Sequence, residues 1–399
     1  MTKTHNQEWT NWSGSLRFTP AVHAEPKSEE ELAAVVRDAV RDGCKVRIAG
    51  AGHSSVPLVE TKEVLVSLGK MKGVIDHDTT RNRATILPGM SVGEAGTALQ
   101  KIGLAMHNTG DVDIQLLSGA IGTGTHGSGW KLANLSWMLA GVRMVTASGE
   151  VQEYSVDDDP DFMNAARVGL GSLGIYSALT LQLEPAYQLF RREWCARVGT
   201  ALENLDELIQ RNRHFDMYWY PRADQVKLRI ANIPGSGMTE VPWAKCVKEE
   251  QGWVNGVLPR HRELRFDEME YALPAEAGVA CFKEVRERVR KKHRQYVGWR
   301  VFFRTVAADE GWLSPCHGRQ TVTIAILQNA QLEYWRYFKD IEPIFRAHGG
   351  RPHWGKKHTL KAGELRPLYP RWDDFQRVRR EKDPGGVFMN PYLEELLGQ

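Results

Sequence analysis

The first half of the chain alternates between helical and strand patterns. Ser28-Glu29-Glu30-Glu31 has the form of a capping box, and apolar residues then recur three or four positions apart as far as Gly43. This pattern predicts a helix that Gly43 stops in the left-handed conformation, followed by a strand at residues 45–49. A second capping box, from Ser91 to Glu94, predicts another helix, which Gly103 ends.

Further strand patterns occur in both halves of the chain. In the first half, strands are predicted at residues 83–87, 141–146 and 176–183, with a helix near 161–168. Pro185 marks a plausible domain boundary, because the pattern shifts after it to alternating strands at 215–220 and 226–230. A basic run at 283–300 is typical of a solvated helix face, and the alternative is a binding site for an anionic partner.

Two segments, residues 50–55 and 108–129, are rich in glycine and small hydroxyl residues. Glycine allows the backbone to approach a ligand closely and to present its amides to phosphate. The first segment (GAGHSS) lacks the third glycine of the Rossmann fingerprint, and no helix pattern starts there. The loops alone fit either an extended phosphorylated cofactor or structural turns, but His53 inside the first loop favours the cofactor.

Composition limits the class of protein. The 399 residues, of which 42% are hydrophobic and 25% charged, are typical of a soluble globular chain with one large or two moderate domains. A net charge of +3 is too small to indicate nucleic acid binding. The five cysteines are widely spaced and form no CxxC pair, so we expect neither disulfides nor a metal site. Without a visible signal peptide or a long apolar run, we expect a cytoplasmic protein with no membrane partner.

Several short motifs together carry a resemblance to a known family. They are residues 11–14 (NWSG), 50–54 (GAGHS), 118–129, 304–309 (RTVAAD), 312–315 (WLSP), 351–356 (RPHWGK) and 383–384 (DP). In this order, they resemble the vanillyl-alcohol-oxidase superfamily, closest to its alditol oxidases and sugar-1,4-lactone oxidases. The resemblance implies an α+β fold with a PCMH-type FAD-binding domain at 12–185. It also implies a substrate-binding cap domain of antiparallel sheet and flanking helices at 186–350. A C-terminal segment at 351–399 would complete the active site and the FAD-binding domain.

The resemblance implies that FAD is the cofactor and that His53 bonds covalently to its flavin ring. The second glycine-rich segment contains no cysteine, so a second covalent attachment is not expected. The other residues implied to contact the cofactor are Ala49, Gly50, Ala51, Gly52, Ser54, Gly110, Ser118, Gly119, Gly122, Thr123, His126, Gly174 and Ile175.

The resemblance also assigns the chemistry. Family members transfer hydride from a carbon that bears a hydroxyl group to the flavin, while cations stabilise the charge that develops on the oxygen. Lys356 and Arg304 match the two family cations; the alternative for each alone is a surface ion pair. Asp111 is a third catalytic candidate, and a turn residue is the alternative. Gly110 aligns with a position where glycine opens a path for O2, which favours an oxidase that forms H2O2.

Three positions depart from alditol oxidases. Phe302, Ala325 and Leu327 replace a glutamate, a histidine and a threonine that hydrogen-bond the substrate there. Because a pocket built for several hydroxyls would keep these polar groups, we expect a small substrate that is less hydroxylated than a polyol. We also expect the substrate to bring an anionic group to Arg304 and Lys356, which otherwise lose a carboxylate partner.

The sequence therefore predicts a covalent FAD oxidase that acts on a CH–OH group. Two alternatives stay open. One is a flavin dehydrogenase or a biosynthetic enzyme that oxidises a C–N or C–C bond. The other is a binding protein that holds FAD without turnover.

Overall fold

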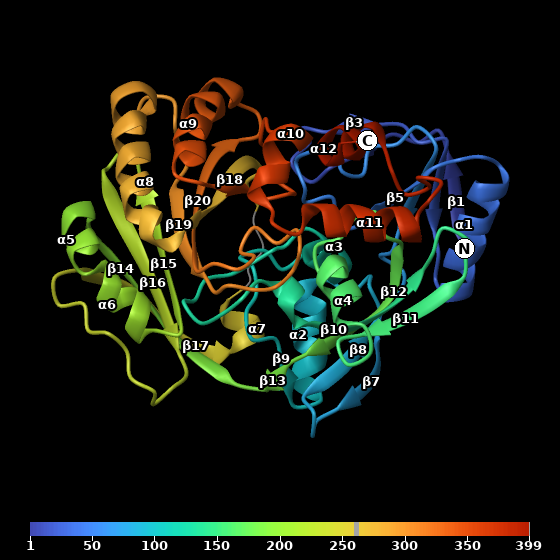
Figure 1. Ribbon diagram of the computed structural model, residues 1–399. Helices are drawn as coiled ribbons and strands as arrows, with labels where there is room; N and C mark the ends of the chain where they lie inside the picture. Colours follow the sequence, from blue (N-terminus) through green and yellow to red (C-terminus); the bar gives the residue numbers. More distant parts are fainter. Residues whose placement is uncertain (259–262, 399) are drawn as a thin grey trace.

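The N-terminal part of the chain forms a mixed sheet, drawn in blue in Figure 1. The computed structural model describes residues 1–258 and 263–398. The sheet has the order β1 (Thr2–His5), β4 (Val22–Glu25), β6 (Val64–Ser67), β5 (Val46–Ala49), and only β1 runs antiparallel. The predicted helix is α1 (Glu29–Arg41), with Ser28 accepting from the Glu31 amide and Gly43 at a φ of 69°. Strand β1 lies before residue 12, where we expected the domain to begin.

A second, antiparallel sheet follows. Its order is β11 (Val151–Ser155), β10 (Leu139–Val145), β12 (Ile175–Gln182), β8 (Arg83–Ile86), β7 (Val74–Asp78). The helices of this part are α2 (Val92–Lys101), which begins at the predicted capping box, α3 (Leu117–Gly122) and α4 (Pro160–Ala166). Helix α3 is a correction, because the second glycine-rich segment was expected to be loop throughout. The apolar side chains of Leu117, Ala120 and Ile121 are buried on one face of that short helix.

The third sheet has eight strands and forms the left half of Figure 1. The order is β17 (Lys245–Trp253), β14 (Gln188–Arg197), β16 (Gln225–Asn232), β15 (His214–Tyr220), β19 (Val301–Val306), β20 (Thr321–Asn329), β18 (Phe266–Pro274), β21 (Arg351–Pro352). All its pairings are antiparallel. The accompanying helices are α5 (Val198–Glu203), α6 (Leu205–Arg211), α7 (Val254–Val257), α8 (Ala275–Arg288) and α9 (Trp335–Ala347). The expected fold class is thereby confirmed.

Smaller elements join these parts. Two-stranded pairs are formed by β2 (Trp9–Thr10) with β3 (Arg17–Phe18) and by β9 (Leu104–Ala105) with β13 (Glu184–Pro185). The C-terminal helices α10 (Ala362–Leu365), α11 (Trp372–Lys382) and α12 (Pro391–Leu397), red in Figure 1, extend from the large sheet to the N-terminal part. There the Val46 amide donates to the Val387 carbonyl at 2.7 Å, and the Asn390 side chain donates to the Pro57 carbonyl at 2.9 Å.

Other expectations concern single features. The basic run occupies the end of α8 and a π-helical turn (Val289–His293), where most basic side chains are exposed and several pair with acids, as in Lys291–Glu287. The five cysteines are all free. Within the described residues, no helix is long and apolar enough to cross a membrane, and no group of three metal-ligating side chains occurs.

Candidate active site

A single large cavity gathers most of the residues that the motifs singled out. Its lining residues run from Trp9 to Lys356, so the N-terminal and C-terminal parts of the chain both form its wall. The predicted residues that line it are His53, Gly50, Ala51, Gly52, Ser54, Gly110, Asp111, Ser118, Gly119, Gly122, Thr123, His126, Gly174, Ile175, Phe302, Arg304 and Lys356. Three predicted residues do not line it: Ala49 is buried within β5, while Ala325 and Leu327 are fully buried in β20.

His53 lies in the wall of this cavity, beside aromatic rings. Its imidazole is 4.6 Å from the Trp12 ring and 6.2 Å from the Phe266 ring, measured between centroids. Burial, together with the positive charge of Lys356, lowers the pKa of His53 to about 4, so the ring is neutral at physiological pH. Its Nδ1 is buried without a hydrogen-bond partner within the described part of the chain. A neutral nitrogen with a free lone pair suits covalent attachment to a flavin.

Glycine is found at positions of the cavity wall for two different physical reasons. At Gly119 and Gly122 a Cβ atom would meet nothing within 4 Å, so both leave open space on the cavity side for a bulky cofactor. Gly52 has a φ of 68°, and Gly174 has a φ of 154° and would press a Cβ onto the Val145 carbonyl at 2.9 Å. These two glycines are required by the backbone and its packing. The cavity fits FAD through its glycine-lined wall and through His53.

Two carboxylates that the sequence analysis missed surround Lys356. The Lys356 ammonium lies 2.8 Å from Glu268 Oε1 and also contacts Glu270 Oε2. Glu270 is fully buried and also faces His126, whose Nε2 is 3.2 Å from Glu270 Oε1. Burial opposes the charge of Glu270, but Lys356 and His126 outweigh it and hold the pKa of Glu270 well below its usual range. Burial raises the pKa of Glu268; Lys356 opposes this shift, and the neighbouring Glu270 adds to it.

The signal for this pair was present in the sequence. Glu268 and Glu270 stand two positions apart in an otherwise largely apolar strand, so both point to the same face of the sheet. Acidic residues in such a strand are rarely buried unless they are paired. The segment contains none of the family motifs, so motif comparison alone does not reveal this pair.

Arg304 is also paired within the chain. Its Nη2 lies 3.4 Å from Asp111 Oδ2, and the same carboxylate accepts from Tyr218 Oη at 2.5 Å and from Arg229 Nη2 at 3.1 Å. Burial lowers the pKa of Arg304, but Asp111 and Glu270, with smaller effects of Tyr218 and Asp216, together outweigh burial and raise this pKa above its ordinary value. Our reason for expecting a substrate anion at Arg304 and Lys356 was therefore wrong, because carboxylates of this chain already compensate both cations.

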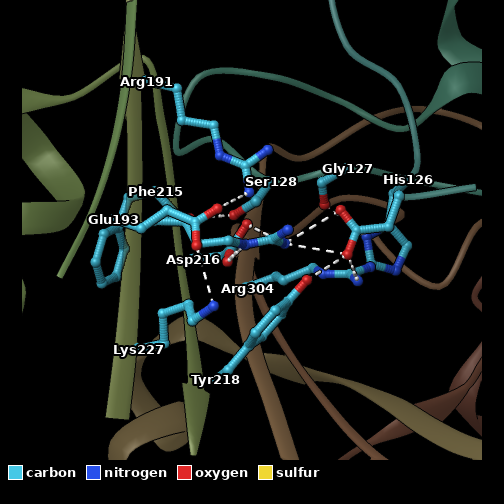
Figure 2. Close-up of polar contacts among 12 residues, drawn as sticks. His126, Gly127, Ser128, Arg191, Glu193, Phe215, Asp216, Tyr218, Lys227 and Arg304 are labelled. Atoms are coloured by element: carbon cyan, nitrogen blue, oxygen red, sulfur yellow. Dashed lines mark hydrogen bonds and ion pairs between the residues drawn. The ribbon is translucent and has the colours of Figure 1, made fainter. Parts of the chain in front are cut away.

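The register of the large sheet extends this charge pairing outward. Lys248, Glu193, Arg229, Asp216 and Arg304 are successive cross-strand neighbours from the edge strand β17 to β19. Their signs alternate, so each charge has an opposite charge beside it. Figure 2 shows Asp216, Arg304 and Tyr218 directed toward the same group of polar contacts, with Glu193 linked to Arg191 and Lys227. Arg304 is tied to this row through Asp111, which contacts both Arg304 and Arg229.

Comparison with protein families matches both parts of the chain. Residues 20–155 match the model described as FAD binding domain, and residues 179–252 and 242–396 match the model of D-arabinono-1,4-lactone oxidase. The chain is 35% identical to the L-gulono-1,4-lactone dehydrogenase of Mycobacterium tuberculosis, over 98% of this chain and 99% of that protein. It is 30% identical to the alditol oxidase of Streptomyces sp., over 97% and 98% of the two chains.

A solved structure shows the same fold. Cholesterol oxidase from Brevibacterium sterolicum superposes with a TM-score of 0.86 over 99% of this chain and 97% of that chain, at 16% identity. Together with the cavity, these matches define the class: the protein is a FAD-dependent oxidoreductase that acts on CH–OH donors. Within that class, the chain belongs to the D-arabinono-1,4-lactone oxidase family, which confirms the resemblance drawn from the motifs.

Proposed function

We propose that this enzyme oxidises a secondary hydroxyl group of a sugar-1,4-lactone, with covalently held FAD as hydride acceptor and O2 as the final acceptor. One observation carries the proposal: a buried, neutral imidazole with a free Nδ1 shares one cavity with the paired cations Lys356 and Arg304. The relatives named for gulonolactone and arabinonolactone activity support the substrate class. The apolar Phe302 in the cavity supports a substrate less hydroxylated than a polyol.

FAD, when bound, supplies the oxidising equivalent by accepting a hydride from the substrate carbon. Lys356 and Arg304 stabilise the negative charge that develops on the substrate oxygen as its proton leaves. Both act as preorganised donors, because their carboxylate partners fix them before the substrate arrives. Asp111 holds Arg304 and Tyr218, and it also lines the cavity, where it can accept a hydrogen bond from a substrate hydroxyl.

Glu268 takes the hydroxyl proton. It lines the cavity, it is largely buried, and it lies beside Lys356. Two adjacent carboxylates whose pKa values are pushed apart are a common arrangement for acid–base work. Here Glu270 keeps its charge behind the wall of the cavity, whereas the raised pKa makes Glu268 the better proton acceptor.

Gly110 supports the choice of an oxidase. It lines the cavity, and a Cβ at this position would meet the Thr125 methyl at 3.1 Å and the His126 carbonyl at 3.6 Å. Any side chain at residue 110 would therefore fill space beside the cofactor wall. Glycine keeps this part of the cavity wall free of a side chain, which supports access of O2 to the cofactor.

Anaerobic stopped-flow absorbance tests both halves of the proposal. Mixing the purified holoenzyme with L-gulono-1,4-lactone should bleach the flavin, and admitting O2 should restore the colour with formation of H2O2. Alditols of equal length serve as the comparison and should bleach it far more slowly. If no sugar lactone bleached the flavin, the substrate class would be wrong. If reduced flavin persisted in air and reacted only with dyes, the enzyme would be a dehydrogenase.

A further inference from the structure

Arg300 is a cation of the cavity that the family motifs do not cover. It stands at the end of the basic run, just before β19, and lines the cavity with Phe302 and Arg304. Because successive side chains of extended backbone alternate, residues 300, 302 and 304 share one face of the sheet. The Phe302 ring has the Arg304 guanidinium 4.7 Å from its centre and the Arg300 guanidinium 5.0 Å from it. The two guanidinium groups are thus close enough to contact one small molecule.

The partners of Arg300 differ from those of the other cavity cations. Lys356 touches two carboxylates, and Arg304 touches Asp111. The side chain of Arg300 makes no hydrogen bond or ion pair with any residue that the structure describes, and its Nε is buried without a partner. It rests instead on aromatic rings, with its guanidinium 4.6 Å from the centre of Tyr218. This cation therefore lacks a compensating anion.

A partly buried guanidinium without an anion is costly to maintain. Aromatic faces offer it some electrostatic compensation, but they accept no strong hydrogen bond from its N–H groups. A carboxylate matches the guanidinium fork with two parallel hydrogen bonds, and such pairs are stronger than neutral ones. The Phe302 and Tyr218 rings that face Arg300 stack on each other, 4.4 Å apart between centroids, and a ligand carboxylate would supply the acceptor that their faces lack.

We propose that Arg300 is a specificity-determining residue that binds a carboxylate at the end of the substrate remote from the reacting hydroxyl. This inference rests on the proposed function and narrows it to sugar lactones that carry a terminal carboxylate. The reacting hydroxyl lies at Arg304 and Lys356, the sugar carbons cross the Phe302 ring, and the carboxylate pairs with Arg300. The anionic group that the sequence led us to expect is thus recognised by a third cation.

Two lactones that differ only at the terminal carbon test the proposal. L-Gulono-1,4-lactone ends in CH2OH, and D-glucaro-6,3-lactone is the same ring with a carboxylate at that carbon. The wild-type enzyme should reduce its flavin with a kcat/KM at least about tenfold higher for the carboxylate, as expected for a charge-assisted pair. In R300Q the ratio of the two kcat/KM values should fall at least about tenfold, and R300K should retain part of it. R377Q, which removes an exposed arginine paired with Glu381, is the matched control and should keep the wild-type ratio.

Binding provides a readout that does not require turnover. Calorimetry on holoenzyme whose flavin has been chemically reduced should show tighter binding of D-glucaro-6,3-lactone than of L-gulono-1,4-lactone, weakening with added salt and lost in R300Q. Equal affinities in the wild type, or an unchanged ratio in R300Q, would overturn the assignment of Arg300. If R300Q does not fold, the wild-type preference and R300K decide the matter. Flavin reduction by neither lactone would instead refute the proposed function.

Discussion

At the scale of single residues, His53 shows how environment determines chemistry. A single histidine gives no functional signal by itself, and only its position in a glycine-rich loop distinguishes His53 in the sequence. In the folded chain, burial and Lys356 keep the ring neutral, and Nδ1 has no hydrogen-bond partner among the residues that the structure describes. Arg304, Lys356 and Asp111 could likewise be nominated from short motifs. Their pairing partners could not, because Glu268, Tyr218 and Arg229 come from other strands and belong to no motif used here.

The first prediction concerns the covalent link. His53→Ala should give folded protein whose flavin is released into the supernatant on acid precipitation, because no other imidazole is expected to hold it. Absorbance of the supernatant and of the pellet measures the released and the bound fraction. His348→Ala, which removes a histidine paired with Glu284 away from the cavity, should leave the flavin in the pellet. A yellow pellet from His53→Ala would show that another residue carries the cofactor.

At the scale of elements, strand β18 brings two carboxylates to the Lys356 ammonium. Alternation of side chains predicts that Glu268 and Glu270 share a face, but it does not say which face is covered. The strand register identifies the face: Glu270 pairs with Ala325, and Ala325 pairs with Phe302, which lines the cavity. Both glutamates therefore lie on the cavity face of the sheet. Helix α3 is a second case. Its glycines and serine argued for a loop, yet the burial of its apolar residues overrode that local preference.

The second prediction uses the pH dependence of flavin reduction. Burial and Glu270 raise the pKa of Glu268, so the carboxylate form needed to accept a proton is lost as the pH falls through that raised value. The rate of anaerobic flavin reduction should therefore rise with pH above the usual titration range of a glutamate. Glu268→Gln should be slower by about 10²-fold or more and should lose this ascending limb. Glu268→Asp, which keeps the acid, should retain it.

Unfolding measurements should accompany these rates. A glutamine at this position also removes a charge beside Lys356, so a changed melting temperature would point to a structural effect. An unchanged ascending limb in Glu268→Gln would assign the proton acceptor to a different group.

At the scale of the whole molecule, Arg47 joins segments that are distant in sequence. It is fully buried, and its guanidinium donates to the carbonyls of Leu58, Leu170, Gly171 and Phe388, using all five N–H groups. These carbonyls belong to two loops near the cavity and to the C-terminal segment. The same side chain lines the cavity. Arg47 therefore contributes both to the packing of the C-terminal segment and to the wall of the cofactor site.

The third prediction follows from the hydrogen bonds that Arg47 donates to these carbonyls. Arg47→Met should lower the free energy of unfolding by at least about 3 kcal/mol, because several buried carbonyls lose their donors. Urea denaturation of the holoenzyme measures the loss, and flavin retention after gel filtration should fall with it. Arg17→Met, which breaks only the exposed pair with Glu8, should change the free energy of unfolding by less than about 1 kcal/mol. A similar small effect in Arg47→Met would show that water or neighbouring donors replace the guanidinium.

The sequence by itself determined the class of fold, the FAD cofactor and the family, because capping boxes, strand alternation and short motifs act locally and keep their order along the chain. It also nominated His53, Arg304 and Lys356, whose motifs are contiguous. Only the tertiary structure decided which charges are compensated. Glu268 reaches Lys356 across 88 positions and Asp111 reaches Arg304 across 193, contacts that depend on strand register and loop placement. Arg300 differs from these cations only in its tertiary contacts. That it lacks a carboxylate partner among the described residues therefore follows from the structure and not from the sequence.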